Sequence, residues 1–357
     1  MQVYIILFIC LLILVLLDGK CKQSTLRIPL LFVAIFIIAL PALRCSTSSA
    51  DTLSYIYHFQ YPDRGYNGEK TEPLYELFVR LLGVVSKDWR FFITAETIVA
   101  ILPVFFLIYK YSKNLSFSLY LFTTFGPVIF FYLMYFGNIR QTVSLGFICL
   151  SQYYLMQKNY GKMNKIKSIL FWVMASFIHT SSFIGILCFF IDRVKLKRKQ
   201  IIYIIVGAVV LGGSNVLSFF SFLNAGDTFY FNTADLGATG SSFTLAFPLL
   251  CSSIMVLSRP VEEFNNSFWM KMFFFMGVLL MLFSNSIANN IDRFVLVFFP
   301  SAIIAIPAYF KNAKTSIYTR LFCYAIIIFY ANRFFVNLAM QMLNVAGSPV
   351  PYTTYFD

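Results

Sequence analysis

The segment SILFWVMASFIHTSSFIGILCFFI, residues 168–191, decides how this chain is organised, because its 24 residues suffice for one membrane crossing. Four lysines precede it between positions 158 and 167, and five lysines or arginines follow between 193 and 199. Basic connections stay in the cytoplasm, so a single crossing would export one of these clusters and invert everything downstream. Two half-length helices, 168–178 and 182–191, satisfy both flanks. The segment therefore predicts a re-entrant hairpin that bends at His179. Because non-helical backbone survives at membrane depth only beside protein or a water-filled cavity, the bend also predicts a cavity.

The rest of the chain has the composition of a membrane protein. It is 59% hydrophobic and 12% charged, whereas soluble domains carry about 25% charged residues. Apolar runs long enough to cross a bilayer recur from end to end. We expect an all-α polytopic membrane protein that forms one domain over residues 1–357. It should have about ten transmembrane helices plus the hairpin at 168–191. The expected spans are 2–17, 27–43, 91–109, 115–136, 139–156, 201–220, 243–258, 269–284, 294–310 and 317–336.

The positive-inside rule assigns a side to each connection. The basic connections, predicted to be cytoplasmic, are 18–27, 110–114, 157–167, 259–271 and 311–320. The connections 44–90, 137–140, 221–242 and 285–293 and the tail after 336 then face the other side. That side carries seven arginines but only Lys70 and Lys87. Since the guanidinium is a better fork for phosphate and carboxylate than the ammonium, the bias indicates an anion site at the outer face.

Two arginines stand close to the starts of apolar helices. Arg140 follows Gly137-Asn138, and Arg293 precedes the span 294–310 with Asp292 beside it. A helix N-terminus offers unpaired amides to an anion, so an arginine there reinforces a phosphate site. Arg44 and Arg333 lie near the ends of other spans. The alternative for each arginine is an interfacial side chain or an ion-pair partner of an acidic residue. The acidic candidates are Asp51, Glu72 and Asp292.

His179 offers a similar choice. A lone histidine in an apolar segment is usually a satisfied core residue. In the bend between two half-helices, however, a buried site can tune it for proton transfer. We expect the second role for His179.

The outer loop 44–90 contains two distinct pieces. Aromatic residues alternate at period two over 55–61, which predicts a packed strand, an interfacial aromatic belt or a surface on which sugar rings stack. Apolar residues at helical spacing over 73–86 predict an amphipathic helix that begins at Pro73 and lies on the membrane. Its polar face would carry Tyr75, Glu76 and Arg80, with the last two spaced for an i,i+4 ion pair.

Several classes of function lack support in the sequence. The seven cysteines show no paired spacing, and with two histidines a protein-bound zinc site is not expected. No glycine-rich nucleotide loop is present, so we expect no cofactor and no metal. The net charge of +13 is explained by membrane orientation, and no nucleic acid partner is expected.

Ordered patches of the sequence resemble the EpsG-like, Wzy-type polysaccharide polymerases. The patches are Asp51 with Tyr55, EPLYELF at 72–78, NIRQTVSLGF at 138–147, FIHTSSFIGIL at 177–187, IDRFVLVFFP at 291–300, and Pro351-Tyr352. The resemblance implies a fold similar to the GT-C class of glycosyltransferases. It also implies a bacterial inner-membrane enzyme that acts at the periplasmic face, within the lipid bilayer. Undecaprenyl-diphosphate-linked oligosaccharide would be both donor and acceptor, and a chain-length regulator protein is a further candidate partner.

The resemblance also suggests roles for individual residues. Arg140 and Arg293 would hold the diphosphates and stabilise charge on the leaving group, with Arg44 and Arg333 as further diphosphate ligands. His179, Asp51 or Glu72 would act as general base, and we favour His179. The residues expected to contact glycan are Tyr55, Tyr57, Tyr75, Arg80 and Asp292.

Other functions share some of these features. A flippase for lipid-linked oligosaccharide would also need a cationic cavity, although no paired repeats or matching broken helices are seen. A membrane acyltransferase could use His179 as its base. An O-antigen ligase takes similar substrates, but such ligases carry a larger outer loop late in the chain than 221–242.

Overall fold

The computed structural model describes residues 2–18, 23–49, 51–65, 71–125, 134–157, 161–213, 242–282, 295–312, 316–343, 352–354 and 356. Within these ranges every regular element is a helix, and the only β pairing is one isolated bridge between Arg44 and Thr354. The all-α prediction is therefore confirmed. The chain divides into two compact units, Met1–Gly185 with Ile306–Asp357, and Ile186–Ala305. The prediction of one functional membrane domain stays a prediction.

Three helices are long and apolar enough to cross a membrane: Thr25–Ala42, Trp89–Tyr111 and Ile317–Val336. Six shorter apolar helices accompany them among the described residues: Gln2–Leu17, Leu115–Thr124, Thr180–Ile191, Ala246–Leu257, Phe268–Leu282 and Leu296–Lys311. These segments support a membrane protein. The expected number of about ten spans stays a prediction.

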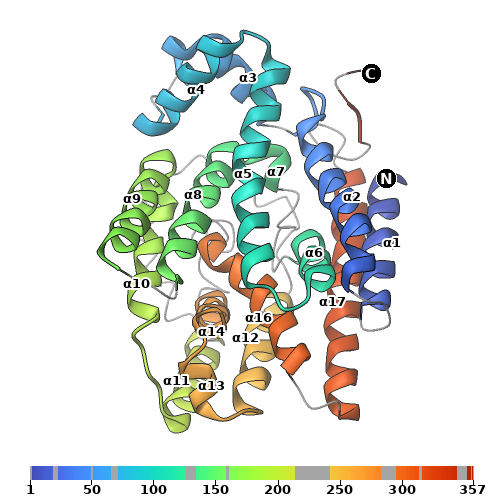
Figure 1. The fold of residues 1–357 in the computed structure, drawn as a ribbon, viewed down its shortest axis with the longest axis vertical. Helices are drawn as coiled ribbons and strands as arrows, with labels where there is room; N and C mark the ends of the chain where they lie inside the picture. The colour runs from blue at the N-terminus through green and yellow to red at the C-terminus, as the bar shows by residue number, and fades with distance from the viewer. Residues whose placement is uncertain are drawn as a thin grey trace. The chain divides into compact units, whose positions relative to one another are not determined.

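The first unit contains the helices that position the candidate site (Figure 1). In chain order they are α1 (Gln2–Leu17), α2 (Gln23–Ala42), α3 (Thr52–Gln60), η1 (Pro62–Arg64), α4 (Pro73–Val85), α5 (Trp89–Tyr111), α6 (Leu115–Thr124), α7 (Met134–Gly137), α8 (Ile139–Leu155), α9 (Lys162–Ile178) and α17 (Ile317–Leu343). The 3-10 helix η2 (Thr180–Ile186) follows α9 at the unit boundary.

Small residues let α8 pack closely on its two neighbours. At Gly146 a side chain would place its first carbon 2.8 Å from the backbone oxygen of Val99 on α5. On the side facing α9, the Ser144 hydroxyl donates to the Ala175 carbonyl at 2.9 Å, and the Ser151 hydroxyl donates to the Ser168 carbonyl at 2.8 Å. Glycine and serine at such contacts allow close backbone approach and hydrogen bonds between helices in a membrane protein. The packing fixes α8 in the unit.

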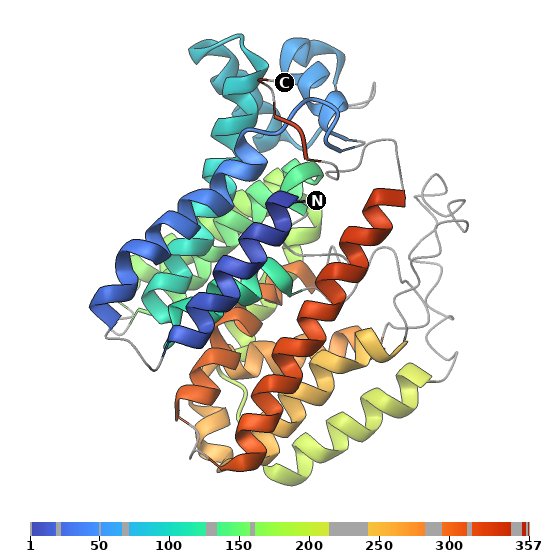
Figure 2. The ribbon, with the colours of Figure 1, turned by 90° about the vertical axis from the view of Figure 1, so that its right-hand side faces the viewer.

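The two ends of the chain pack on each other. Phe8 of α1 stacks on Phe334 of α17, with ring centroids 5.3 Å apart, and Figure 2 shows these helices side by side. Near the C-terminus, the Tyr352 hydroxyl donates to the Leu40 carbonyl at 2.9 Å. Its ring lies 6.2 Å from that of Tyr4 and 6.5 Å from that of Phe136. The last described residues are therefore anchored to α1, α2 and α7.

The connections of the first unit sort to its two ends as the charge pattern predicted. At one end, Asn114 donates to Asp18 at 2.6 Å, Lys311 donates to the Lys113 carbonyl at 2.8 Å, and Gln157 donates to Tyr111 at 3.5 Å. These contacts join four connections that were predicted to be cytoplasmic. At the other end, the loop 44–90 contacts the connection 137–140 through Glu72 and Arg140, and the tail through Cys45 and Thr353. The grouping is confirmed within this unit, and the side of the membrane that each end faces stays a prediction.

The second unit contains α10 (Leu187–Ile191), α11 (Arg198–Gly213), α12 (Ser242–Leu257), α13 (Val261–Asn265), α14 (Phe268–Leu282) and η5 (Leu296–Phe298). The helix α16 (Phe299–Asn312) begins in this unit and ends in the first. Lys271 was expected in a basic connection but lies buried in α14, where its ammonium donates to the carbonyls of Asp192 and Val194. A long lysine stem can stay in apolar packing while its head reaches polar groups.

Three expected elements differ from the structure. The span predicted over 115–136 is interrupted, because α6 ends at Thr124, and Gly126-Pro127 two residues later is a helix-breaking pair that the prediction overlooked. The strand considered for 55–61 is wrong, because this stretch belongs mainly to α3. The first arm of the hairpin begins at Lys162 rather than 168. Its end at Ile178 and the break at His179 are confirmed.

Candidate functional site

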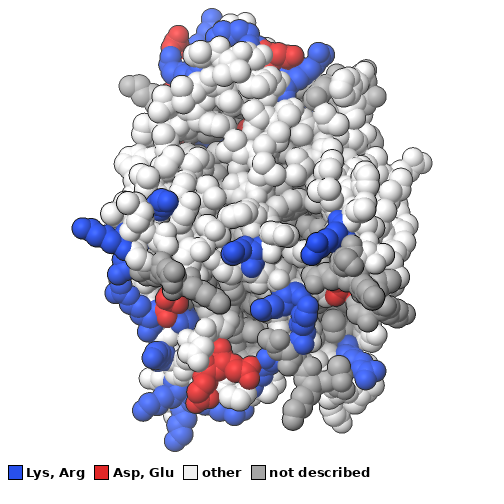
Figure 3. Space-filling model, viewed as in Figure 1, with Lys and Arg blue, Asp and Glu red and all other residues white. Residues whose placement is uncertain are grey.

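The helices α3 and α4 lie where α5 begins, and charged side chains gather around them (Figures 1 and 3). The amphipathic helix predicted for 73–86 is present as α4, and Pro73 starts it. Its apolar residues Leu77, Leu81 and Val85 are exposed. The preceding Glu72 is the N-cap residue, but its side chain makes no capping hydrogen bond. The carboxylate of Glu72 turns instead towards α8 and α9.

Arg140 lies in the first turn of α8, and the segment before it is fixed to the outer loop. The Thr52 hydroxyl donates to the Phe136 carbonyl at 3.0 Å. At Gly137 a first side-chain carbon would lie 2.2 Å from the Ser49 hydroxyl oxygen, so only glycine fits there without a shift. The backbone amide of Thr142 donates to the Asn138 carbonyl at 2.9 Å and begins the helix. These contacts set the position of the Arg140 guanidinium.

His179 lies at the point where α9 ends and the chain reverses. Its amide donates to the Ala175 carbonyl at 2.9 Å, while its backbone is extended at φ −152° and ψ 123°. Beyond it, the indole of Trp172 donates to the Phe183 carbonyl at 3.4 Å, so the chain folds back along α9. The hydroxyls of Ser182 and Ser144 form a short hydrogen bond that ties this return to α8. The reversal thus presents the imidazole towards the outer loop.

Glu72 joins the two side chains. Its Oε2 accepts from Arg140 Nη1 at 2.8 Å, and its Oε1 lies 3.0 Å from His179 Nδ1. The side chains of Glu72, His179 and Arg140 are 14%, 15% and 22% exposed, so the cluster is mostly buried but open to solvent. Three residues from three separate segments, all chosen as candidates from the sequence, therefore meet in one cluster.

The surroundings keep Glu72 ionised. Partial burial alone would raise the pKa of its carboxyl, but the hydrogen bond with His179 and the charge of Arg140 outweigh it and lower the pKa from 4.5 to about 2. An ionised carboxylate can only accept hydrogen bonds, so the proton of a neutral His179 ring lies on Nδ1. The second ring nitrogen, Nε2, then carries the lone pair. This is the arrangement in which a carboxylate orients a histidine base.

Aromatic residues support the cluster from behind. Arg140 Nε donates to the Tyr55 hydroxyl at 3.4 Å, and the Tyr55 ring contacts Tyr75 edge-on at 6.2 Å. His58 stacks on Tyr75 at 6.0 Å and lies 3.1 Å from Glu76 Oε2. Tyr55 and Tyr75 are buried, so in this structure they position other residues and do not offer a face to glycan.

Comparison with known families identifies the chain. The model of the EpsG family matches residues 27–354. The chain belongs to the EpsG family. No curated protein matches it, and no solved structure does either. In this EpsG family member, three of the patches that carried the resemblance meet at the Glu72 cluster: 72–78, 138–147 and 177–187. Membership supports a membrane protein with a role in making surface polysaccharide.

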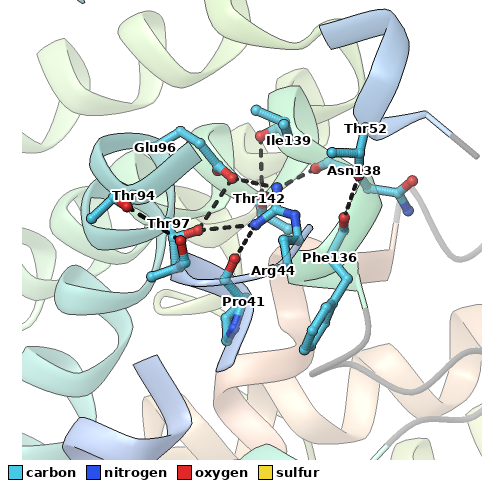
Figure 4. A network of polar contacts seen from close by, with 11 residues as sticks. Pro41, Arg44, Thr52, Thr94, Glu96, Thr97, Phe136, Asn138, Ile139 and Thr142 are labelled. Atoms are coloured by element: carbon cyan, nitrogen blue, oxygen red, sulfur yellow. Dashed lines mark hydrogen bonds and ion pairs between the residues drawn. The ribbon is translucent and has the colours of Figure 1, made fainter. Parts of the chain in front are cut away.

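In the EpsG family member, Arg44 makes its polar contacts with Pro41, Glu96 and Thr97 (Figure 4) and not with Glu72. Arg44 is fully buried, donates to Glu96 at 2.7 Å and to Thr97 at 3.2 Å, and also contacts the Pro41 carbonyl. The alternative reading of Arg44 as an ion-pair partner fits, but its partner is Glu96 rather than one of the expected acids. As placed, Arg44 fastens α2 to α5 and has no surface on which to bind a diphosphate.

The remaining candidates are dispersed. Asp51 is the N-cap residue of α3, without a side-chain capping bond, and Tyr57 is exposed on α3. Arg80 is paired with Glu76 at 2.8 Å, as predicted, and with Asp63 at 2.8 Å. Arg333 is partly buried on α17 and forms no ion pair with the described residues. Asp292 and Arg293 lie outside the described residues, so their roles stay predictions.

Two polar features of the outer end were missed from the sequence. Glu96 lies within the apolar helix α5, and that placement was a signal, because an acidic residue inside a span needs a partner. The pair of His58 and Glu76 gave no such signal, since its members are 18 residues apart in a loop whose fold was unknown. Among the described residues, no group of three or more His, Cys, Asp or Glu side chains converges on a metal-sized site.

Proposed function

We propose that this protein is a polysaccharide polymerase that joins lipid-diphosphate-linked repeat units at the periplasmic face of the bacterial inner membrane. The observation that carries the proposal is the Glu72 carboxylate, which holds Arg140 and His179 within 3.0 Å in a member of the EpsG family. The cluster combines an oriented base with a cation. A glycosyl transfer from a diphosphate donor needs both of these groups.

His179 is the general base in this proposal. Its Nε2 takes the proton from a hydroxyl of the incoming lipid-linked repeat, and the oxygen attacks the anomeric carbon of the growing chain. Glu72 does not act as the base, because a carboxylate with a pKa of about 2 is too weak to take that proton near neutral pH. Glu72 is instead a positioning residue that fixes the tautomer of His179.

Arg140 stabilises the leaving group. As the new bond forms, the bond from the anomeric carbon to the diphosphate oxygen breaks, and undecaprenyl diphosphate departs with the electron pair. A guanidinium matches the geometry of phosphate and is always charged, so it can offset the developing negative charge. A single displacement inverts the anomeric centre. Arg293 would assist at a second phosphate.

Reconstitution tests the proposal directly. The full-length protein in nanodiscs is incubated with the lipid-diphosphate-linked repeat unit of its own host, and the products are resolved by length. We expect a ladder of lipid-linked chains for the natural protein and short, unpolymerised glycan for Arg140→Ala and His179→Ala.

Two results would overturn the proposal. Transfer of substrate between leaflets without lengthening indicates a flippase, and dependence on an acyl donor indicates an acyltransferase. Wild-type ladders from both alanine variants, at equal protein levels in the membrane, would remove these residues from the mechanism.

A further inference from the structure

The outward face of α3 carries an aromatic cluster that the Glu72 cluster does not use. Tyr57 and Tyr61 lie one turn apart, with ring centroids 5.0 Å apart, and they are 41% and 49% exposed. The Arg64 guanidinium carbon is 5.2 Å from the Tyr61 ring centroid and 5.9 Å from that of Tyr57. Arg64 also donates to the Tyr57 hydroxyl. The two rings are thus held in place while much of their surface meets solvent.

The chain after α3 fixes this arrangement. The 3-10 turn η1 begins at Pro62 and ends at Arg64, and the C-cap residue Gly65 has a φ of 70°, which favours glycine. Asp63 in this turn is 88% exposed and accepts from Arg80 of α4 at 2.8 Å. Exposed rings beside an exposed ion pair offer an apolar face and polar groups at the same place. A sugar ring has the same mixed character, with C–H groups on its faces and hydroxyls at its edge.

The exposed face of α4 provides a contrast on the neighbouring helix. Leu77, Leu81, Val84 and Val85 are exposed there, and none of these side chains is aromatic or charged. That face suits the acyl region of a membrane, as expected for an amphipathic surface helix. The α3 face differs, because the Arg64 guanidinium lies against its rings. The difference favours a polar, ring-shaped ligand at α3 over the interior of a bilayer.

We propose that Tyr57, Tyr61 and Arg64 form a carbohydrate subsite for the growing glycan, an inference that rests on the proposed function. Tyr55 points inward to Arg140, and Tyr57, two residues later on the same helix, points outward. The subsite and the reacting centre are therefore separated by about the width of a helix, 10 Å. The subsite holds sugars beyond the one that reacts. It supports elongation and leaves formation of the first bond unaffected.

Chain-length analysis of the reconstituted full-length protein tests the subsite. The probe is the host's lipid-diphosphate-linked repeat unit, and the variants are the double substitution Tyr57→Ala with Tyr61→Ala and its phenylalanine counterpart. Loss of two stacking rings should weaken glycan binding by about three- to thirtyfold. We expect the first condensation to stay within about twofold of the natural rate, and mean chain length to fall several-fold. Phenylalanine should restore length, because it keeps the rings.

A control and three contrary results make the test decisive. Tyr109→Ala removes an exposed tyrosine at the far end of α5 and should leave the ladder unchanged. An unchanged ladder from the double alanine variant would overturn the subsite. So would equal loss of the first and later condensations. Weakened binding to glycan-free anionic vesicles, with normal chain length, would assign these rings to the membrane interface. Absence of any ladder from the natural protein would instead refute the proposed function.

Discussion

Replacing Glu72 by glutamine tests how the cluster is held together. The substitution keeps the size of the side chain but removes the charge that Arg140 and His179 share. A carboxylate whose pKa falls from 4.5 to about 2 stabilises the folded protein by at most about 3 kcal/mol. Partial solvent contact reduces this to about 2 kcal/mol. We expect Glu72→Gln to lower the unfolding temperature by a few degrees at pH 7.

The sign of the pH dependence follows from the direction of the pKa shift. Because the folded-state pKa of Glu72 lies below its unfolded value, its stabilisation is present above pH 4.5 and is lost as pH falls towards 2. Thermal unfolding of the natural protein in detergent should therefore approach that of Glu72→Gln over this range. A constant difference between the two proteins from pH 7 to pH 2 would contradict the shift.

The rate of the first condensation gives the functional readout. Without the carboxylate, neither the Nδ1 proton of His179 nor the guanidinium of Arg140 is held, so we expect a loss of at least about a hundredfold. The matched control is Glu76→Gln, one turn later on α4, because the Glu76 carboxylate contacts Arg80, His58 and Thr71 rather than the reacting groups. A wild-type rate in Glu72→Gln, or an equal loss in Glu76→Gln, would refute the role of Glu72.

Three further substitutions test other contacts. Arg140→Lys keeps the charge but removes the fork, so the condensation rate should fall about tenfold to a hundredfold. Its control, Arg259→Lys in the ion pair with Glu263, should react normally, and an equal fall in both would count against the fork. Arg44→Met leaves the buried Glu96 carboxylate without its ion-pair partner, so the free energy of unfolding should fall by about 3–5 kcal/mol. Adding Glu96→Met to this variant should restore both stability and activity. A stable but inactive double variant would instead show that Arg44 binds substrate. Gly146→Val would place the valine Cβ 2.8 Å from the backbone oxygen of Val99 on α5, so the unfolding temperature should fall by several degrees. An unchanged unfolding temperature would contradict the close contact between α8 and α5.

Much of the fold follows from patterns that are local in sequence. The positions of the long apolar runs in the sequence predicted both ends of six helices within a few residues: α1, α2, α5, α8, α12 and α14. The lysine and arginine pattern also grouped the connections at the two ends of the first unit. The local pattern failed to distinguish a strand from a helix over residues 55–61, because the aromatic residues there match the spacing of both. Tyr55 and Phe59, like Tyr57 and Tyr61, are four residues apart, so the same aromatics that alternate at period two also match a helix.

The candidate site was predictable in its members but not in its geometry. Arg140 and His179 stood out in the sequence because ionisable side chains beside apolar helices are energetically costly and commonly mark functional sites. Glu72 appeared only as one of several acids, since the sequence does not show which acid a loop brings to α8 and α9. Tyr55 was expected to face glycan, but the fold of α3 turned it inward to Arg140.

The contact between the two ends of the chain has a consequence for biogenesis. Tyr4 and Leu40 emerge early from the ribosome, but their partner Tyr352 is synthesised more than 300 residues later. At about 5–20 residues per second, that delay is roughly 15–60 s. Throughout this interval the surfaces of α1 and α2 that contact Tyr352 lack this partner. A chaperone or insertase that shields these surfaces would therefore have its main task during synthesis rather than after it.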